Sequence, residues 1–140
     1  MSRIVYSYYV LDIIHSGHIE MMRNAKAMAG ADGELIVGIL TDEAVMERKP
    51  KPAMTFAQRV GVARAIKYVD LVVAQHEYSP LPNVRQIMPD ILMESLSHTE
   101  DDLAEARATM AAFGGRVIVI PYFPEISSTE IKNRIKETQS

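Results

Sequence analysis

The chain alternates short apolar runs with stretches whose apolar residues recur at helical spacing. The runs are rich in β-branched residues and predict five strands, at Arg3–Tyr9, Glu34–Leu40, Asp70–Ala74, Asp90–Met93 and Arg116–Ile120. The helical pattern and the capping residues predict helices at 17–29, from Thr55 to about Lys67, from Pro82 to about Met88, at about 100–113, and from Ser127 to about Lys136. The basic, proline-broken segment 48–54 is predicted to be a loop.

This alternation predicts an α/β fold of the Rossmann-like type, a five-stranded parallel sheet with helices on both faces. No internal repeat, linker or low-complexity stretch interrupts it, so residues 1–140 are expected to form a single domain. Ligands of such sheets bind beyond the carboxyl ends of the strands. The turns after the first, second and fifth predicted strands are therefore the candidate site.

Composition narrows the function classes. The 140 residues carry a formal net charge of −3, which argues against general nucleic-acid binding but leaves room for a local basic pocket. The absence of cysteine excludes disulfides, thiolate catalysis and cysteine-ligated zinc. No apolar run approaches the ~20 residues that cross a bilayer, and the first residues lack the features of a signal peptide. A cytoplasmic location without membrane contact is the expectation.

The strongest chemical signal is Asp12-Ile-Ile-His15-Ser-Gly17-His18, at the predicted turn between the first strand and the first helix. Gly17 permits close backbone approach, and a helix start offers free N–H groups to an anion. His15 and His18 are three residues apart and can project from one side of the first turn, where imidazolium donors could hold phosphate oxygens. The alternatives are two capping or surface histidines, or a metal pair for which no third ligand is evident.

Three further segments are candidates for anion binding. Arg48-Lys49-Pro-Lys51 could reach a triphosphate, or could simply be a solvated loop. Arg59 could grip a phosphate or carboxylate with two donors, or lie exposed on its helix. Ile126-Ser127-Ser128-Thr129 could bind phosphate oxygens or only cap the last helix. His76 and His98 are assigned to polar loops without a role.

Together these motifs resemble the cytidylyltransferase-like nucleotidyltransferases. His15-Ser-Gly-His18 is similar to that family's H-x-G-H signature, and Ile126-Ser-Ser-Thr129 to its second signature. Their order also matches. Asp12 comes before the histidine turn (residues 15–18), which is followed by the lysine loop (Arg48-Lys49-Pro-Lys51) and then by Met54-Thr55-x-x-Gln58-Arg59. Within the family, Pro121-Tyr122 before the second signature most resembles the phosphonate cytidylyltransferase domains that are joined to phosphoenolpyruvate mutase. The glycerol-3-phosphate cytidylyltransferases are the other similar group.

The resemblance implies transfer of CMP from CTP to a small phosphonate such as 2-hydroxyethylphosphonate, with Mg²⁺ accompanying the nucleotide and no protein metal site. It implies catalytic roles for His15, His18 and Lys49. It places at the nucleotide Tyr9, Val10, Asp12, Gly17, Arg59, Ile126, Ser127, Ser128 and Thr129. It places Asp42 and Tyr122 at the acceptor, and it implies a homodimer.

Three departures from the family pattern leave alternatives open. Tyr9-Val10-Leu11 stands where the family has Gly-Thr-Phe, Glu94–Ser97 stands where it has Gly-Asp-Asp-Trp, and Glu125 replaces a glycine. The first change could crowd the nucleotide, the second concerns the choice of base and acceptor, and the third places a negative charge beside a phosphate site. Glycerol-3-phosphate or another phospho-alcohol as acceptor, ATP as donor, and a nucleotide-binding module without catalysis are the competing interpretations.

Overall fold

The computed structural model describes residues 2–95, 98–120 and 128–139, with the side chains of 128–130 and 137–139 excepted. Five strands form one sheet: β1 (Ile4–Tyr9), β2 (Glu34–Leu40), β3 (Leu71–Gln75), β4 (Ile91–Ser95) and β5 (Arg116–Ile120). Six helices accompany them: α1 (Ser16–Ala29), α2 (Asp42–Met46), α3 (Phe56–Arg64), α4 (Leu81–Ile87), α5 (Glu100–Ala111) and α6 (Ser128–Gln139). The described part of the chain contains no helix long and apolar enough to span a bilayer.

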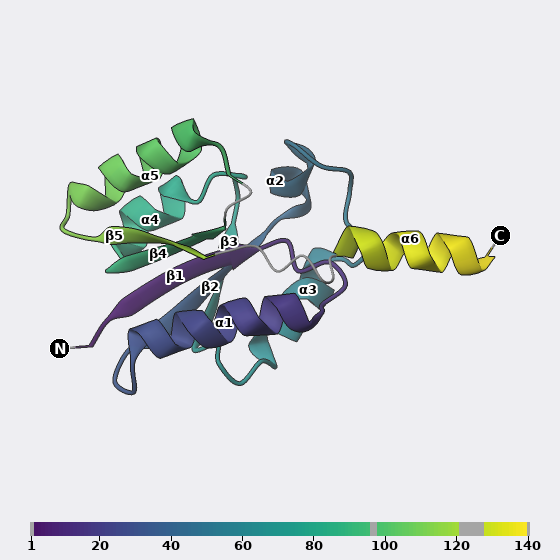
Figure 1. Cartoon of the computed structure of the whole chain (residues 1–140), viewed down its shortest axis with the longest axis horizontal. Helices are drawn as coiled ribbons and strands as arrows, with labels where there is room; N and C mark the ends of the chain where they lie inside the picture. The colour runs from purple at the N-terminus through teal and green to yellow at the C-terminus, as the bar shows by residue number, and fades with distance from the viewer. Residues whose placement is uncertain (1, 96–97, 121–127, 140) are drawn as a thin grey trace.

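The sheet is parallel throughout, with the strand order β3-β2-β1-β4-β5. In Figure 1, α1 and α3 lie on one side of the sheet and α4 and α5 on the other. Two hydrophobic clusters correspond to these faces: Val5, Met22 and Ala63 belong to the first, and Leu92 and Met110 to the second. The predicted α/β architecture is confirmed.

The strand order creates a crevice at one edge of the sheet. From β1 the chain moves outward through β2 to β3, and then returns to place β4 on the other side of β1. The connections that follow β1 and β4 therefore pass to opposite faces of the sheet. A crevice opens between them beyond the carboxyl ends of these strands, which is where doubly wound sheets bind their ligands. Helix α6 lies beyond this same edge (Figure 1).

The helix ends follow the predicted capping chemistry. Thr55 and Gln58 form the reciprocal capping box at the start of α3, and Thr99 accepts a hydrogen bond from the Asp102 amide at the start of α5. Helix α1 ends at Gly30, whose φ of 80° favours glycine. The capping box predicted for Ser127 and Glu130 lies outside the described residues.

Two predictions of local structure are wrong. Helix α2 was missed, because five residues are too few to show helical periodicity; the Thr41 side chain caps it by accepting from the Ala44 amide. The fourth strand extends to Ser95, beyond its predicted end at Met93; a buried charged residue is rare, so the sequence gives little indication of this extension. In the structure Glu94 pairs with Val119 in the ladder, and its side chain is only 4% exposed.

Candidate functional site

The two histidines of the turn after β1 cap helix α1 together. The Nδ1 atom of His15 accepts the Gly17 N–H at 3.1 Å, and the Nδ1 atom of His18 accepts the His15 N–H at 3.1 Å. This is a capping box built from imidazoles rather than from hydroxyl and carboxyl groups. Because Nδ1 is the acceptor in each ring, a neutral ring must carry its proton on Nε2. The cap thereby fixes both rings as Nε2–H donors.

The structure corrects the expected charge of this pair. Burial and the neighbouring His15 lower the pKa of His18 from 6.5 to about 4. The two ring centroids lie 4.0 Å apart, so a second positive charge is disfavoured there. His18 is therefore a neutral donor at neutral pH, and not the imidazolium that the sequence suggested.

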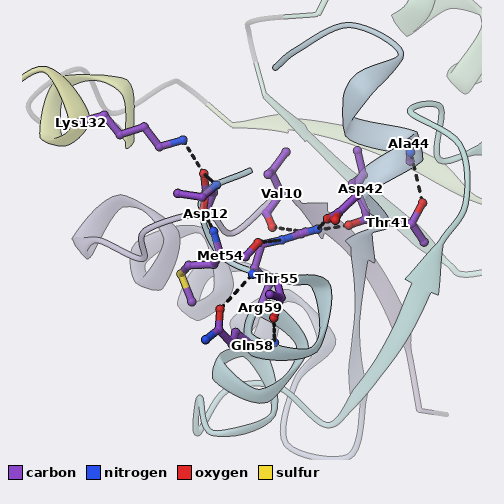
Figure 2. A network of polar contacts seen from close by, with 12 residues as sticks. Val10, Asp12, Thr41, Asp42, Ala44, Met54, Thr55, Gln58, Arg59 and Lys132 are labelled. Atoms are coloured by element: carbon purple, nitrogen blue, oxygen red, sulfur yellow. Dashed lines mark hydrogen bonds and ion pairs between the residues drawn. The ribbon is translucent and has the colours of Figure 1, made fainter. Parts of the chain in front are cut away.

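Asp12 holds three segments together beside this turn. Its carboxylate accepts the backbone N–H groups of Ala53 and Met54, each at 2.9 Å, and it pairs with Lys132 of α6. Figure 2 shows the Lys132 ammonium reaching from α6 to Asp12. Burial acts to raise the pKa of Asp12, but the Lys132 contact and the two amides outweigh it and hold the pKa below its usual range. Asp12 thus fixes the end of the lysine loop against the histidine turn.

Arg59 lies beneath the crevice with its side chain 0% exposed. Its Nη1 donates to the carbonyls of Val10 and Leu40 at 2.8 and 2.7 Å, and its Nε donates to the Met54 carbonyl at 3.3 Å. Its Nη2 contacts Asp42 Oδ1 at 2.7 Å (Figure 2). The guanidinium therefore joins the ends of β1 and β2 to the start of α3.

A pocket of about 980 Å³ opens at the carboxyl edge of the sheet. It brings together most of the described residues that the sequence predicted for the site: Tyr9, Val10, Asp12, His15, Gly17, His18 and Lys49. Arg59 and Asp42 are not among its lining residues. Tyr122, Ile126 and Ser127 lie outside the described residues, and Ser128 and Thr129 begin α6 with side chains that are likewise outside the description.

Four lysines supply positive charge to the pocket. Lys49 and Lys51 come from the loop after α2, and Lys132 and Lys136 from α6. The sequence analysis found the first two but missed Lys132 and Lys136. Their spacing of four residues places them on one face of α6, which was the available signal.

A cluster of three polar side chains, from Tyr8, Glu94 and His98, also lines the pocket, and the sequence did not predict it. The Tyr8 hydroxyl contacts the Glu94 carboxylate at 2.7 Å, and His98 Nε2 lies 2.9 Å from Glu94 Oε2. The hydrogen bond to Glu94 raises the pKa of His98 despite its partial burial. His98 lies in the loop before α5, as predicted, but it also lines the pocket beside Glu94; only its spacing of four residues from Glu94 hinted at this pair.

The pocket has two sides, because adjacent residues of a strand face opposite sides of a sheet. Tyr9 and Met93 pack in the cluster that contains α1. Tyr8 packs against the cluster that contains α4 and α5 and against a third cluster, formed by Leu40, Ala44 and Val45. Its hydroxyl contacts Glu94. On the first side, Ser7 Oγ and Tyr9 Oη are buried, and the other described residues offer neither of them a hydrogen bond. Burial raises the pKa of Tyr9 to about 12, and the neighbouring Ser7 hydroxyl opposes this rise.

Comparison with known proteins identifies relatives. The model of the family described as Cytidylyltransferase-like matches residues 10–134. The FAD synthase of Korarchaeum cryptofilum is 31% identical over 137 residues, which cover 96% of this chain and 92% of that protein. The bifunctional protein HldE of Proteus mirabilis is 34% identical over 137 residues, but this chain spans only 28% of its length.

A solved structure supports the fold. The lipopolysaccharide core biosynthesis protein of Thermoplasma volcanium superposes with a TM-score of 0.73 at 24% sequence identity. The match covers 88% of this chain and 98% of that one.

Proposed function

Since this chain belongs to the cytidylyltransferase-like family and is a nucleotidyltransferase, we propose that it transfers CMP from CTP to a small phosphonate such as 2-hydroxyethylphosphonate. The observation that carries the proposal is the pocket at the carboxyl edge of the sheet. His15 and His18 line it from the start of α1, Lys49 from the lysine loop, and Lys132 from α6. Such a ring of donors suits a bound triphosphate.

In the proposed reaction, an anionic oxygen of the acceptor attacks the α-phosphorus of CTP. A new P–O bond forms there as the bond to the β-phosphate oxygen breaks, and pyrophosphate leaves with that electron pair. The acceptor oxygen is already ionised, so no general base is required. Catalysis then depends on placing the reactants in line and on stabilising the charge that develops on the phosphates.

The residues divide this work by their chemistry. His15 and His18 donate through Nε2–H to phosphate oxygens, with their direction fixed in advance by the cap of α1. Lys49 and Lys132 contribute compact positive charges to the phosphate groups. Arg59 and Asp42, predicted at the nucleotide and at the acceptor respectively, act in this proposal beneath the pocket by holding its backbone.

The two sides of the pocket suit different substrates. Tyr9, Met21 and Met93 offer a largely apolar surface to a flat base, and Ser7 lines the same side of the pocket. The opposite side, with Tyr8 and Glu94, is polar and suits a small acceptor. The phosphate-binding residues then lie between the two substrates, as in-line transfer requires.

Magnesium is expected to enter with the nucleotide. Among the described residues, no group of three or more His, Asp, Glu or Cys side chains is placed to hold a metal ion. Mg²⁺ is commonly bound through substrate phosphates together with water, where it neutralises their charge.

ATP is the alternative donor, because one similar protein is a FAD synthase and FAD contains an adenylyl group. Glycerol-3-phosphate or another phospho-alcohol is the alternative acceptor, since the pocket also provides cations for a phosphate monoester. We further expect a homodimer, which light scattering of the purified protein measures.

The experiment is pyrophosphate release from CTP and from ATP, each tested with 2-hydroxyethylphosphonate and with glycerol-3-phosphate in the presence of Mg²⁺. We expect the highest kcat/KM with CTP and the phosphonate. Faster release with ATP assigns the chain to the alternative donor. Nucleotide binding without pyrophosphate release for any pair contradicts the proposed reaction.

A further inference from the structure

Glu94 is a buried carboxylate at the wall of the pocket. It lies near the end of β4, its side chain is 4% exposed, and it lines the pocket together with Tyr8 and His98. A carboxylate in such a place requires hydrogen-bond donors, because burial removes the water that would otherwise solvate it.

The contacts of Glu94 are unequally divided between its two oxygens. Oε2 receives the Tyr8 hydroxyl at 2.7 Å and lies 2.9 Å from His98 Nε2. Oε1 has one contact among the described residues, the longer 3.0 Å approach of the same Tyr8 hydroxyl. A tyrosine hydroxyl has a single proton, and here its shorter contact is to Oε2. Oε1 therefore retains the capacity to accept a hydrogen bond.

Lys49 provides a second fixed point in the same pocket. A small acceptor with a phosphonate or phosphate at one end can place that group near Lys49 and extend its other end toward Glu94. Two-point binding of this kind orients the attacking oxygen better than charge attraction alone.

We propose that Glu94 selects the acceptor by accepting a hydrogen bond from a hydroxyl or ammonium group on the end remote from the phosphonate or phosphate. This inference rests on the proposed function. It deepens that function, because it defines the acceptor class: a phosphonate or phosphate ester that carries a terminal hydrogen-bond donor. An acceptor analogue that ends in a methyl group leaves Glu94 Oε1 buried without this hydrogen-bond donor. Such an analogue should therefore bind more weakly.

The charge of the cluster favours a hydroxyl over an ammonium group. The raised pKa of His98 increases the fraction of its ring that is protonated, and in that state it forms a neutral pair with Glu94. A neutral donor then completes the hydrogen bonding without adding a net charge to the buried wall.

The test compares three phosphonates that differ only at the remote end: 2-hydroxyethylphosphonate, 2-aminoethylphosphonate and propylphosphonate, whose chain ends in a methyl group. Their dissociation constants are measured by titration calorimetry on the full chain, alongside pyrophosphate release with CTP. The variants are Glu94→Met, which removes the acceptor atoms, and Glu94→Gln, which keeps the shape if the first does not fold. Glu105→Met is the matched control, since Glu105 is an exposed residue of α5.

We expect 2-hydroxyethylphosphonate to bind the wild-type chain more tightly than propylphosphonate, by about tenfold or more, and also more tightly than 2-aminoethylphosphonate. We expect Glu94→Met to remove this preference, Glu94→Gln to weaken it, and Glu105→Met to preserve it. Equal binding of the three phosphonates by the wild type overturns the inference, as does an unchanged preference in folded Glu94 variants. If the binding preference is preserved but no pyrophosphate is released, the result contradicts the proposed function and leaves the inference about Glu94 intact.

Discussion

Replacing Arg59 with methionine tests whether the guanidinium holds the site together from below or contacts the nucleotide. The methionine side chain fills much of the same space but leaves the carbonyls of Val10 and Leu40 without their donor. It also leaves Asp42 without its cation. Each buried carbonyl that loses its donor lowers the free energy of unfolding by about 1–3 kcal/mol, and Asp42, whose side chain is 30% exposed, adds less than a fully buried carboxylate would. Together these losses are a large part of the ~5–15 kcal/mol total of a typical domain.

Urea unfolding followed by circular dichroism measures the effect. Arg64→Met is the control, because Arg64 ends the same helix and is exposed; we expect its unfolding free energy to stay within about 0.5 kcal/mol of wild type. An Arg59→Met protein of wild-type stability that no longer binds nucleotide would falsify the structural role. It would instead favour the phosphate contact suggested by the sequence.

Three further predictions concern the pocket. His18→Ala should lower kcat by roughly 10²–10³ through loss of one preorganised donor, measured as pyrophosphate release; a rate near that of wild type contradicts the assigned role. Lys132→Met should weaken nucleotide triphosphate binding by about tenfold or more in calorimetry, while Lys67→Met, at an exposed lysine that does not line the pocket, should not. The pKa of His98 is raised by Glu94, so their ion pair stabilises the fold fully below pH 6.5, and the stabilisation is lost as pH rises through the folded-state pKa. The difference in unfolding free energy between wild type and His98→Gln should therefore shrink as the pH rises above about 6.5, and growth of that difference with pH contradicts the assignment.

The sequence predicted the parallel sheet and the position of the histidine turn because both depend on neighbouring residues. Strand periodicity and helix capping act over a few positions, so the Thr55–Gln58 capping box and the start of α1 could be located without knowledge of the fold. The same proximity placed His15, Gly17 and His18 at one end of α1. The structure then showed that these histidines cap the helix and also line the pocket, two roles that the sequence treated as alternatives.

The partners of the charged residues were decided by the tertiary structure. Lys132 is 120 residues from Asp12, Tyr8 is 86 residues from Glu94, and Arg59 is 49 residues from the Val10 carbonyl. These groups meet because β4 lies beside β1 and because α3 begins below the ends of β1 and β2. Strand order is a property of the whole sheet, and no single segment encodes it. The sequence by itself therefore determined the order of strands and helices and the position of the histidine turn, whereas the packing of the sheet decided which charged residues line the pocket and which support it from beneath.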